Sequence, residues 1–296
     1  MCRLSRITTL FVAVVCVVCV GCTNGLHVKF GGATAAFQET RTSVVEHVVD
    51  SAIDVESVNG AITVTESDRA DVQVIAHIKA QTEERLRATS VIVARDELNN
   101  LNVRVEWPDE RKGNEGCSFQ MEVPNAYNVT LRSSNGKITL TGLEGTARLK
   151  TNNGAVRVNG FDGDVEVDTS NGSVKVHDVE GIVDADTSNG SIEIINAKQD
   201  VIADTSNGSV KVKLADVDSA GPLKIDSSNG SVHLELNSAF AGKLSCRTSN
   251  AKIRLDGIGG EIIEDGKKSK TIQFGESIAE SRVKTSNGSI TVKQPR

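Results

Sequence analysis

Aromatic side chains are scarce in this sequence: Phe, Trp and Tyr together make 3% of its residues. A compact globular core normally gains much of its buried area from such side chains. Stacked repeats do not need them, because small and β-branched side chains fill a narrow interior layer upon layer. Val, Ile and Gly are frequent whereas Met is rare, so the composition favours β structure in an elongated array.

Positive charge is also in short supply, since the formal net charge is −6 at pH 7. A protein that binds nucleic acid needs a basic face to neutralise phosphates. No run of basic residues interleaved with aromatics exists here. We therefore expect no nucleic-acid partner, and the sequence indicates no cofactor.

Cysteine is nearly absent once the first 22 residues are set aside. Cys117 and Cys246 are the two that remain, and no C-x-x-C motif supports a zinc or redox site. An oxidising compartment would allow these two to pair, but no spacing rule favours it, so pairing stays open. The histidines are scattered without the spacing of metal ligands.

The N-terminal segment 1–21 is typical of a lipoprotein signal peptide, with two early Arg residues and an apolar run. That run is shorter than the ~20 residues that span a membrane comfortably. Cys19-Val20-Gly21-Cys22 resembles a lipobox, which predicts lipidation of Cys22, a flexible tether over 22–42 and a location in the bacterial cell envelope, facing the periplasm or the exterior. Cleavage near Ala33-Thr34-Ala35 without a lipid and an uncleaved anchor are the alternatives.

A repeated stretch organises the rest of the chain. Thr169-Ser170-Asn171-Gly172-Ser173-Val174 has close copies before and after it, at steps of eighteen residues, and looser copies follow. A fixed period of this size is the signature of a stacked array. The Asn residues of the copies are Asn135, Asn153, Asn171, Asn189, Asn207, Asn229, Asn250 and Asn287, with an early relative at Asn59.

Each copy contains two short stretches of alternating apolar and polar residues, which predict two strands and two corners per coil. We expect an all-β, single-stranded right-handed β-helix (β-solenoid) with coils of about eighteen residues, stacked at ~4.8 Å. The Gly of each Asn-Gly corner is expected to adopt a positive φ. Asn-Gly is also the strongest hairpin signal, so an antiparallel meander is the alternative fold.

The predicted solenoid domain covers residues 43–296. Regular repeats occupy 131–255, an irregular insertion occupies 256–282, and a last coil occupies 283–296. Residues 81–88 combine early acidic with late basic residues and predict one short helix inserted near the N-terminal part.

One acidic column is the only candidate metal site. Asp168, Asp186, Asp204 and Asp226 precede the Asn-Gly corner in four copies, so stacking would bring their carboxylates to roughly 5 Å spacing. A divalent cation would relieve their repulsion. The Gly-rich nonapeptide of calcium-binding β-rolls is absent, so we expect a solvated face without a bound metal.

The order of these features resembles the bacterial "putative adhesin" domain family of envelope lipoproteins. The resemblance is carried by the lipobox-like Cys22, by Asn59-Gly60-Ala61-Ile62-Thr63-Val64, by a helix-containing insertion, by Met121-Glu122-Val123-Pro124, and by the serial Ser-Asn-Gly copies; it covers Ile53 to Arg296. It implies a single-stranded right-handed β-helix and no catalytic residues to carry over.

Our functional hypothesis is a non-enzymatic envelope lipoprotein whose repetitive solenoid serves adhesion or surface scaffolding. Its partners would be the membrane, through the lipid, and a cell-wall glycan, an exopolysaccharide or a surface protein. One alternative is a polysaccharide-active enzyme with a site near 256–282, using an acid such as Glu264 or Asp265. Another is a scaffold that self-assembles through its end coils.

Overall fold

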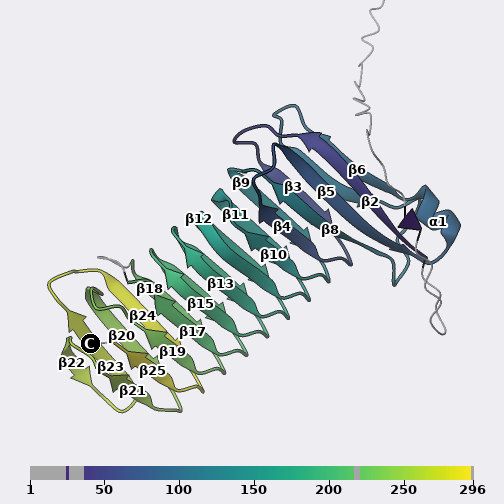
Figure 1. The fold of residues 1–296 in the computed structure, drawn as a ribbon. Helices are drawn as coiled ribbons and strands as arrows, with labels where there is room; N and C mark the ends of the chain where they lie inside the picture. The colour runs from purple at the N-terminus through teal and green to yellow at the C-terminus, as the bar shows by residue number, and fades with distance from the viewer. Residues whose placement is uncertain (1–24, 27–36, 217–220, 295–296) are drawn as a thin grey trace, which may run out of the picture.

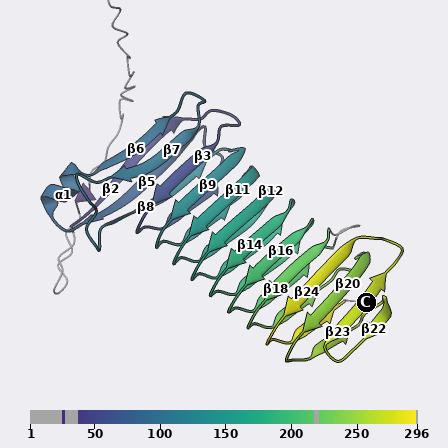
Figure 2. The ribbon, with the colours of Figure 1, turned by 180° about the vertical axis from the view of Figure 1, so that it is seen from behind.

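The computed structural model describes residues 25–26, 37–216 and 221–294, and the signal segment 1–21 and Cys22 lie outside these ranges. Strands follow one another along a single long axis, with the helix of residues 83–88 at one end and the strands of residues 242–293 at the other (Figure 1). The architecture is all-β and solenoid-like. Two layers of strands, here called sheet A and sheet B, form opposite faces of the stack (Figures 1 and 2).

Sheet A contains, from the helix end to the other, β1 (Gly25–Leu26), β2 (Phe37–Glu46), β5 (Asp71–Ala80), β8 (Gly116–Val123), β4 (Ile62–Glu66), β10 (Ile138–Thr141), the first part of β12 (Val156–Thr169), β13 (Val174–Val179), β15 (Ile192–Ala197), β17 (Val210–Leu214), β19 (Val232–Glu235), β25 (Ile290–Lys293) and β21 (Ile253–Asp256).

Sheet B contains, in the same direction, β6 (Ser90–Arg95), β7 (Leu101–Glu106), β3 (Ile53–Ser57), β9 (Asn128–Ser133), β11 (Glu144–Thr151), the second part of β12, β14 (Val183–Thr187), β16 (Val201–Thr205), β18 (Leu223–Ser227), β24 (Glu280–Thr285), β20 (Gly242–Thr248), β23 (Ser269–Phe274) and β22 (Glu261–Asp265).

Successive copies of the repeat pair in parallel, which excludes the antiparallel meander. Val174 of β13 lies beside Val156 on one side and Ile192 on the other, so equivalent residues superimpose. Sheet B behaves in the same way, with Val183 between Val165 and Val201. Each coil therefore consists of one sheet B strand, a corner, and one sheet A strand.

The core lies between the two sheets and is built by the alternation of side chains along each strand. Val174 and Val176 of β13 and Val183 and Ala185 of β14 are fully buried, whereas the residues between them point outward. Burial of such apolar columns is worth roughly 1.5–3 kcal/mol per Val, Leu or Ile side chain. The same columns continue through the stack, so the core is a narrow strip rather than a sphere.

The order of coils in space differs from their order in the sequence at both ends. At the helix end, β3 and β4 form a coil that lies between β7/β8 and β9/β10. At the other end, β24 and β25 lie between β18/β19 and β20/β21, although they come last in the sequence. The expected last coil is therefore enclosed by two others, and the insertion supplies β22 and β23, which extend sheet B beyond it.

The helix predicted from charge placement is present as α1 (Glu83–Ala88), with Thr82 capping its N-terminus. Strand β2 begins at Phe37, inside the segment 22–42 expected to be a tether, because it pairs along its whole length with β5. Gly25 and Leu26 also pair with β2. In the described ranges, no helix has the length and apolar character needed to cross a membrane.

Candidate functional site

The Asn residues of the repeats form one continuous ladder along a corner of the stack, here called the Asn corner. Each side-chain amide donates a hydrogen bond to the side-chain oxygen of the next Asn toward the helix end. These bonds are Asn135 to Asn59 (2.6 Å), Asn153 to Asn135 (2.7 Å), Asn171 to Asn153 (2.8 Å), Asn189 to Asn171 (2.9 Å), Asn207 to Asn189 (2.8 Å), Asn229 to Asn207 (2.8 Å), Asn287 to Asn229 (2.7 Å) and Asn250 to Asn287 (2.6 Å). All donors point the same way, so the amide dipoles add along the ladder.

A second ladder of buried hydroxyl groups runs directly beneath the Asn side chains. Thr187 Oγ1 donates to the carbonyl oxygen of Gly172 in the preceding coil at 3.0 Å, and its counterparts also donate to a corner glycine, except Ser57, which donates to the carbonyl oxygen of Cys117. The hydroxyls are those of Ser57, Ser133, Thr151, Thr169, Thr187, Thr205, Ser227, Thr285 and Thr248. Since a buried carbonyl group is costly when unpaired, this column stabilises each corner on the one before it.

The expectation that the corner glycines adopt positive φ is wrong. Gly172, Gly190 and Gly208 are absent from the residues with left-handed backbone in the described chain. They are required by close packing instead, because a Cβ built on Gly190 would overlap the carbonyl group of Gly172, and the same holds from coil to coil. Ala251, in the coil that lies last in the Asn ladder, is the exception among these corners.

At the helix end, the ladder is closed by the loop that precedes β8. Asn59 donates to the carbonyl oxygens of Gly113 and Glu115, at 3.2 and 3.1 Å. Arg111 donates to the same Glu115 carbonyl oxygen at 2.9 Å. The first Asn amide of the ladder therefore has acceptors in place of a preceding coil.

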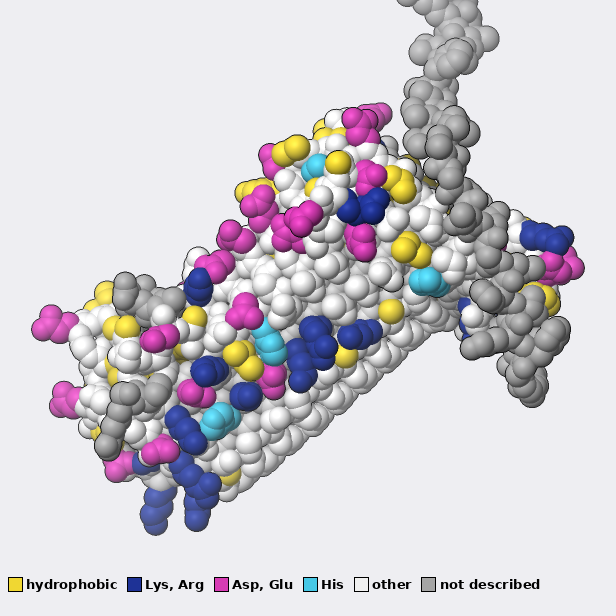
Figure 3. Space-filling view, viewed as in Figure 1, with side chains coloured by type: hydrophobic (Ala, Val, Ile, Leu, Met, Phe, Trp, Pro, Cys, Tyr) yellow, Lys and Arg dark blue, Asp and Glu magenta, His cyan; other side chains and the backbone are white. Residues whose placement is uncertain are grey.

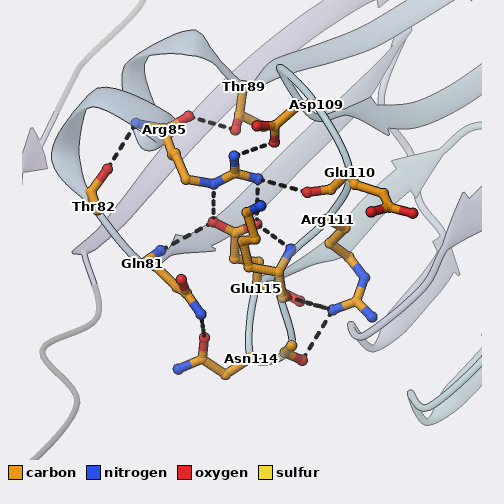
Figure 4. A network of polar contacts seen from close by, with 11 residues as sticks. Gln81, Thr82, Arg85, Thr89, Asp109, Glu110, Arg111, Asn114 and Glu115 are labelled. Atoms are coloured by element: carbon orange, nitrogen blue, oxygen red, sulfur yellow. Dashed lines mark hydrogen bonds and ion pairs between the residues drawn. The ribbon is translucent and has the colours of Figure 1, made fainter.

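A buried ion pair holds this loop against α1 (Figure 4). Arg85 from α1 donates to both carboxylate oxygens of Glu115, at 2.6 and 2.8 Å, and also contacts Asp109. The backbone N–H groups of Gln81 and Lys112 complete the set of donors to that carboxylate. The hydrogen bonds from Arg85 lower the pKa of Glu115 to about 2 and outweigh the burial that alone would raise it.

The outer surface of the Asn corner is exposed and carries almost no charge. Ser188, Asn189 and Ser191 are exposed, and their counterparts in the neighbouring coils are likewise Ser or Asn. Across the five corner positions of all nine coils the only charged side chains are Lys137 near one end and Lys252 at the other. Figure 3 shows this corner as a band without charged side chains along the lower right edge of the stack.

The ladder leaves hydrogen-bonding capacity directed at the solvent. An Asn amide has two N–H groups and an oxygen with two lone pairs, and the ladder uses one of each. The coils of Asn171, Asn189 and Asn207 thus offer one N–H, one lone pair and the hydroxyls of two Ser residues each, repeated at ~4.8 Å. These groups are uncharged and can form hydrogen bonds with hydroxyl or amide groups.

The acidic column lies on the outer face of sheet B, immediately before the Asn corner. Asp168, Asp186, Asp204 and Asp226 are neighbours in register, as the spacing predicts. Burial, and then repulsion from Asp184 and the column neighbours Asp204 and Asp168, raise the pKa of Asp186. Lys150 pairs with Asp168 at 2.6 Å and Arg282 with Asp226 at 3.1 Å, so bases flank the column at both ends. No group of three potential ligands suited to a metal ion occurs among the described residues.

The outer face of sheet A is of mixed charge instead. Glu193 lies between Lys175 and Lys211 in register, within 3.9 Å of each, and accepts from His177 at 3.2 Å. Lys213 and Glu235 pair at 3.7 Å. Figure 3 shows these basic and acidic side chains interspersed over β13 to β25. Such pairs are worth little individually, so this face is compensated rather than strongly charged.

The insertion that was the candidate for a catalytic site forms an exposed hairpin. All five residues of β22 are exposed. Glu264 accepts a hydrogen bond from Thr271 at 3.2 Å, and Asp265 pairs with Lys270. Each of the two acids thus pairs with a residue of β23. Among the described residues, no second acid is hydrogen-bonded to either of them.

The two cysteines of the folded body are free and lie at opposite ends of the stack. Cys117 is in β8 beside the helix end, and Cys246 is in β20 near the other end. Burial raises the pKa of each thiol to about 12. The pairing that the sequence left open is therefore not made.

Sequence reasoning missed the hydroxyl ladder, the Arg85–Glu115 pair and the enclosure of β24 and β25. The hydroxyl column was visible as a position that is always Ser or Thr, two residues before each Asn. Arg85 and Glu115 are 30 residues apart with no shared motif, so no signal connected them.

Comparisons with known proteins place the chain in a family. A family model described as "Toastrack DUF4097" matches residues 50–293. Similar solved structures include a "putative adhesin" from Bacteroides fragilis, with 15% identity over 86% of this chain and 97% of that one and a TM-score of 0.47. A second, from Parabacteroides distasonis, has 15% identity over 86% and 97% and a TM-score of 0.43. A "putative cell adhesion protein" from Clostridium sporogenes has 12% identity over 87% and 100% and a TM-score of 0.28. No curated protein matches the sequence.

Proposed function

Because the chain belongs to the Toastrack DUF4097 family, we propose that it is a non-enzymatic adhesion or scaffolding module of the bacterial cell envelope. The observation that supports this best is the Asn corner, where one Asn ladder runs through nine coils without interruption and Lys137 and Lys252 are the only charged side chains. A catalytic site concentrates several different groups at one place. A contact surface for a polymer repeats the same groups, as this one does.

The proposal includes an anchor at the N-terminus. Residues 1–21 direct export and Cys22 carries the lipid, so that the solenoid is held at a membrane, facing the periplasm or the exterior. Mass spectrometry of the protein purified from its membrane fraction tests this. A mature chain that begins after residue 22, or one without acyl chains on Cys22, contradicts the anchor and leaves the adhesion proposal standing.

The partner that best suits the Asn corner is a neutral glycan of the cell wall or of an exopolysaccharide. Sugar hydroxyls match the exposed amides and Ser hydroxyls, and each residue of an extended glycan would lie against roughly one coil. Individual contacts of this kind contribute only about 0.5–1.5 kcal/mol, so affinity depends on many coils acting together. A surface protein would need apolar anchors, which this corner does not present.

The test is a binding assay of the full mature chain on immobilised neutral and charged glycans. The double variant S188K/S228K places two cations on the corner without touching the Asn ladder. We expect it to lose most of the binding that the wild-type chain shows, while T139K/T291K, which adds the same charge to sheet A, retains it. Equal binding by both variants, no binding to any glycan, or turnover of a glycan contradicts the proposal.

For the fold itself we propose the right-handed sense of winding and coils of about eighteen residues. Parallel strands joined by a crossover are right-handed in about 98% of cases. Chirality assigned from an experimental electron-density map tests this directly.

A further inference from the structure

The two strands β24 and β25, residues 280–293, here called the C-terminal strand pair, fill a slot between two coils that the chain has already built. β24 pairs with β18 on one side and β20 on the other, and β25 pairs with β19 and β21. Without the pair, both sheets would present two facing unpaired edges at this point. Unpaired edges are templates for another strand.

The contacts that hold the pair are those found between all coils. Val283, Ile290 and Val292 are fully buried. Asn287 donates to Asn229 at 2.7 Å and accepts from Asn250 at 2.6 Å, so it completes the ladder on both sides. The slot therefore recognises the general pattern Thr-Ser-Asn-Gly-Ser followed by alternating apolar residues, rather than a local peculiarity of this segment.

The connection to the pair has the features of a hinge. It consists of residues 275–279, between the end of β23 and the start of β24. Gly275 adopts a φ of 60°. Ile278 is 95% exposed, so it makes almost no packing contact of its own.

We propose that the slot also accepts the C-terminal strand pair of a second copy of this chain, so that neighbouring molecules become linked by exchange of this segment. The partner offers identical residues, and every contact in the slot is reproduced between molecules. Exchange of an identical element is a low-cost route to association, since only the hinge changes conformation. Reciprocal exchange gives a dimer, and successive exchange gives a chain of solenoids. This proposal does not depend on glycan binding.

The length of the hinge provides a test in the full chain. Phe274 and Glu280 lie on opposite sides of β20, beside Gly242 and Lys243, so the connection must cover two strand spacings, or about 9.6 Å. Deleting residues 275–278 leaves Ala279 alone, which reaches about 7 Å. The pair can then enter only the slot of another molecule. Light scattering after size exclusion should show dimers or longer species, whereas a variant with four Gly/Ser residues added to the hinge should be monomeric.

A second measurement covers the outcome in which the shortened chain fails to fold. A fluorescent peptide of residues 280–294 is incubated with the intact wild-type protein, at a denaturant concentration that leaves the circular-dichroism signal of the β structure unchanged. We expect the wild-type peptide to co-elute with the protein on gel filtration. The amount of bound G288V peptide should be at least about tenfold lower, because its side chain would overlap the carbonyl group of Gly230. Failure of the wild-type peptide to enter, equal entry of G288V, or a folded monomeric shortened chain overturns the proposal.

Discussion

The two corners of each coil differ sharply in regularity. At the Asn corner, every one of the nine coils keeps the same three-residue path, and each side chain repeats the contacts of the one before it. At the opposite corner, Gly160, Asp178 and Asn196 repeat one left-handed backbone conformation, but this regularity ends at Asn196, where the register between β15 and β17 shifts. The step from Asn207 to Asn229, which passes through this opposite corner, is 22 residues instead of 18.

Excursions of the chain leave from the opposite corner in the repeat region and beyond. These excursions follow the sheet A strands β17, β19 and β21, and none of them interrupts the Asn ladder. Insertions at a corner without a continuous hydrogen-bond column cost little, because loop closure depends weakly on length. The Asn corner therefore sets the register in which coils stack, whereas the opposite corner tolerates loops of different length.

The largest effect is expected from filling a glycine at the Asn corner. In Gly190→Val the new side chain would overlap the carbonyl group of Gly172, and the backbone cannot retreat without breaking the Thr187 hydrogen bond. We expect a loss of on the order of 3 kcal/mol or more in the free energy of unfolding. Denaturant unfolding followed by circular dichroism measures it.

The matched control lies at the opposite corner. Gly160 has a φ of 65° and open space around its Cβ position, and the neighbouring coils place Asp178 and Asn196 in the same conformation. Gly160→Asn should therefore change stability by less than about 1 kcal/mol. If both substitutions cost the same, the difference between the corners is not one of packing.

The next largest effect is expected at the closed end of the ladder. Glu115 is completely buried and accepts hydrogen bonds from Arg85 and from two backbone N–H groups. Glu115→Gln leaves the Arg85 guanidinium without its buried partner, which costs about 3–5 kcal/mol. The exposed Glu110→Gln, whose backbone oxygen alone contacts Arg85, should be nearly neutral.

The same carboxylate predicts a dependence of stability on pH. Its pKa falls from the ordinary 4.5 to about 2 on folding, so its contribution is complete above pH 4.5 and is lost as the pH falls from 4.5 towards 2. Thermal unfolding across this range should show a steeper acid loss for wild type than for Glu115→Gln. Parallel curves would mean that Glu115 has an ordinary pKa in the fold.

The sequence predicted the features that repeat, and failed for those that occur once. Eighteen-residue spacing was enough to predict that Asn171 lies beside Asn153 and Asn189, because equal steps superimpose. It was not enough to order the final coils, since Asn287 belongs to a copy that fits between any two others. The glycine expectation failed because Asn-Gly has two physical meanings, positive φ in a hairpin and close packing in a stack.

A smaller effect is expected from removing one hydroxyl beneath the ladder. Thr187→Val keeps the shape of the side chain but leaves the Gly172 carbonyl oxygen without its donor, at a cost of about 1–3 kcal/mol. Thr187→Ser keeps the hydroxyl, and Ser occupies this column naturally at Ser227. Denaturant unfolding should therefore rank Ser above Val. The reverse order would show that the methyl group, and not the hydrogen bond, stabilises the column.

The smallest effect, and the one of opposite sign, is expected on the outer face of sheet B, in the acidic column beside the Asn corner. Burial and the neighbouring carboxylates raise the pKa of Asp186 in the folded state. The folded protein therefore binds a proton more readily than the unfolded chain between the ordinary and the raised pKa, and stability falls as the pH rises through that interval. Asp186→Asn removes this cost and should stabilise the fold at neutral pH by at most about 1 kcal/mol, less in 1 M salt. Asp168→Asn, which forfeits the pair with Lys150, should bring no such gain. If Asp186→Asn is destabilising at low salt, the carboxylates of the column do not repel one another on balance. The stacking of like residues would then stabilise the face of sheet B as it does the Asn corner.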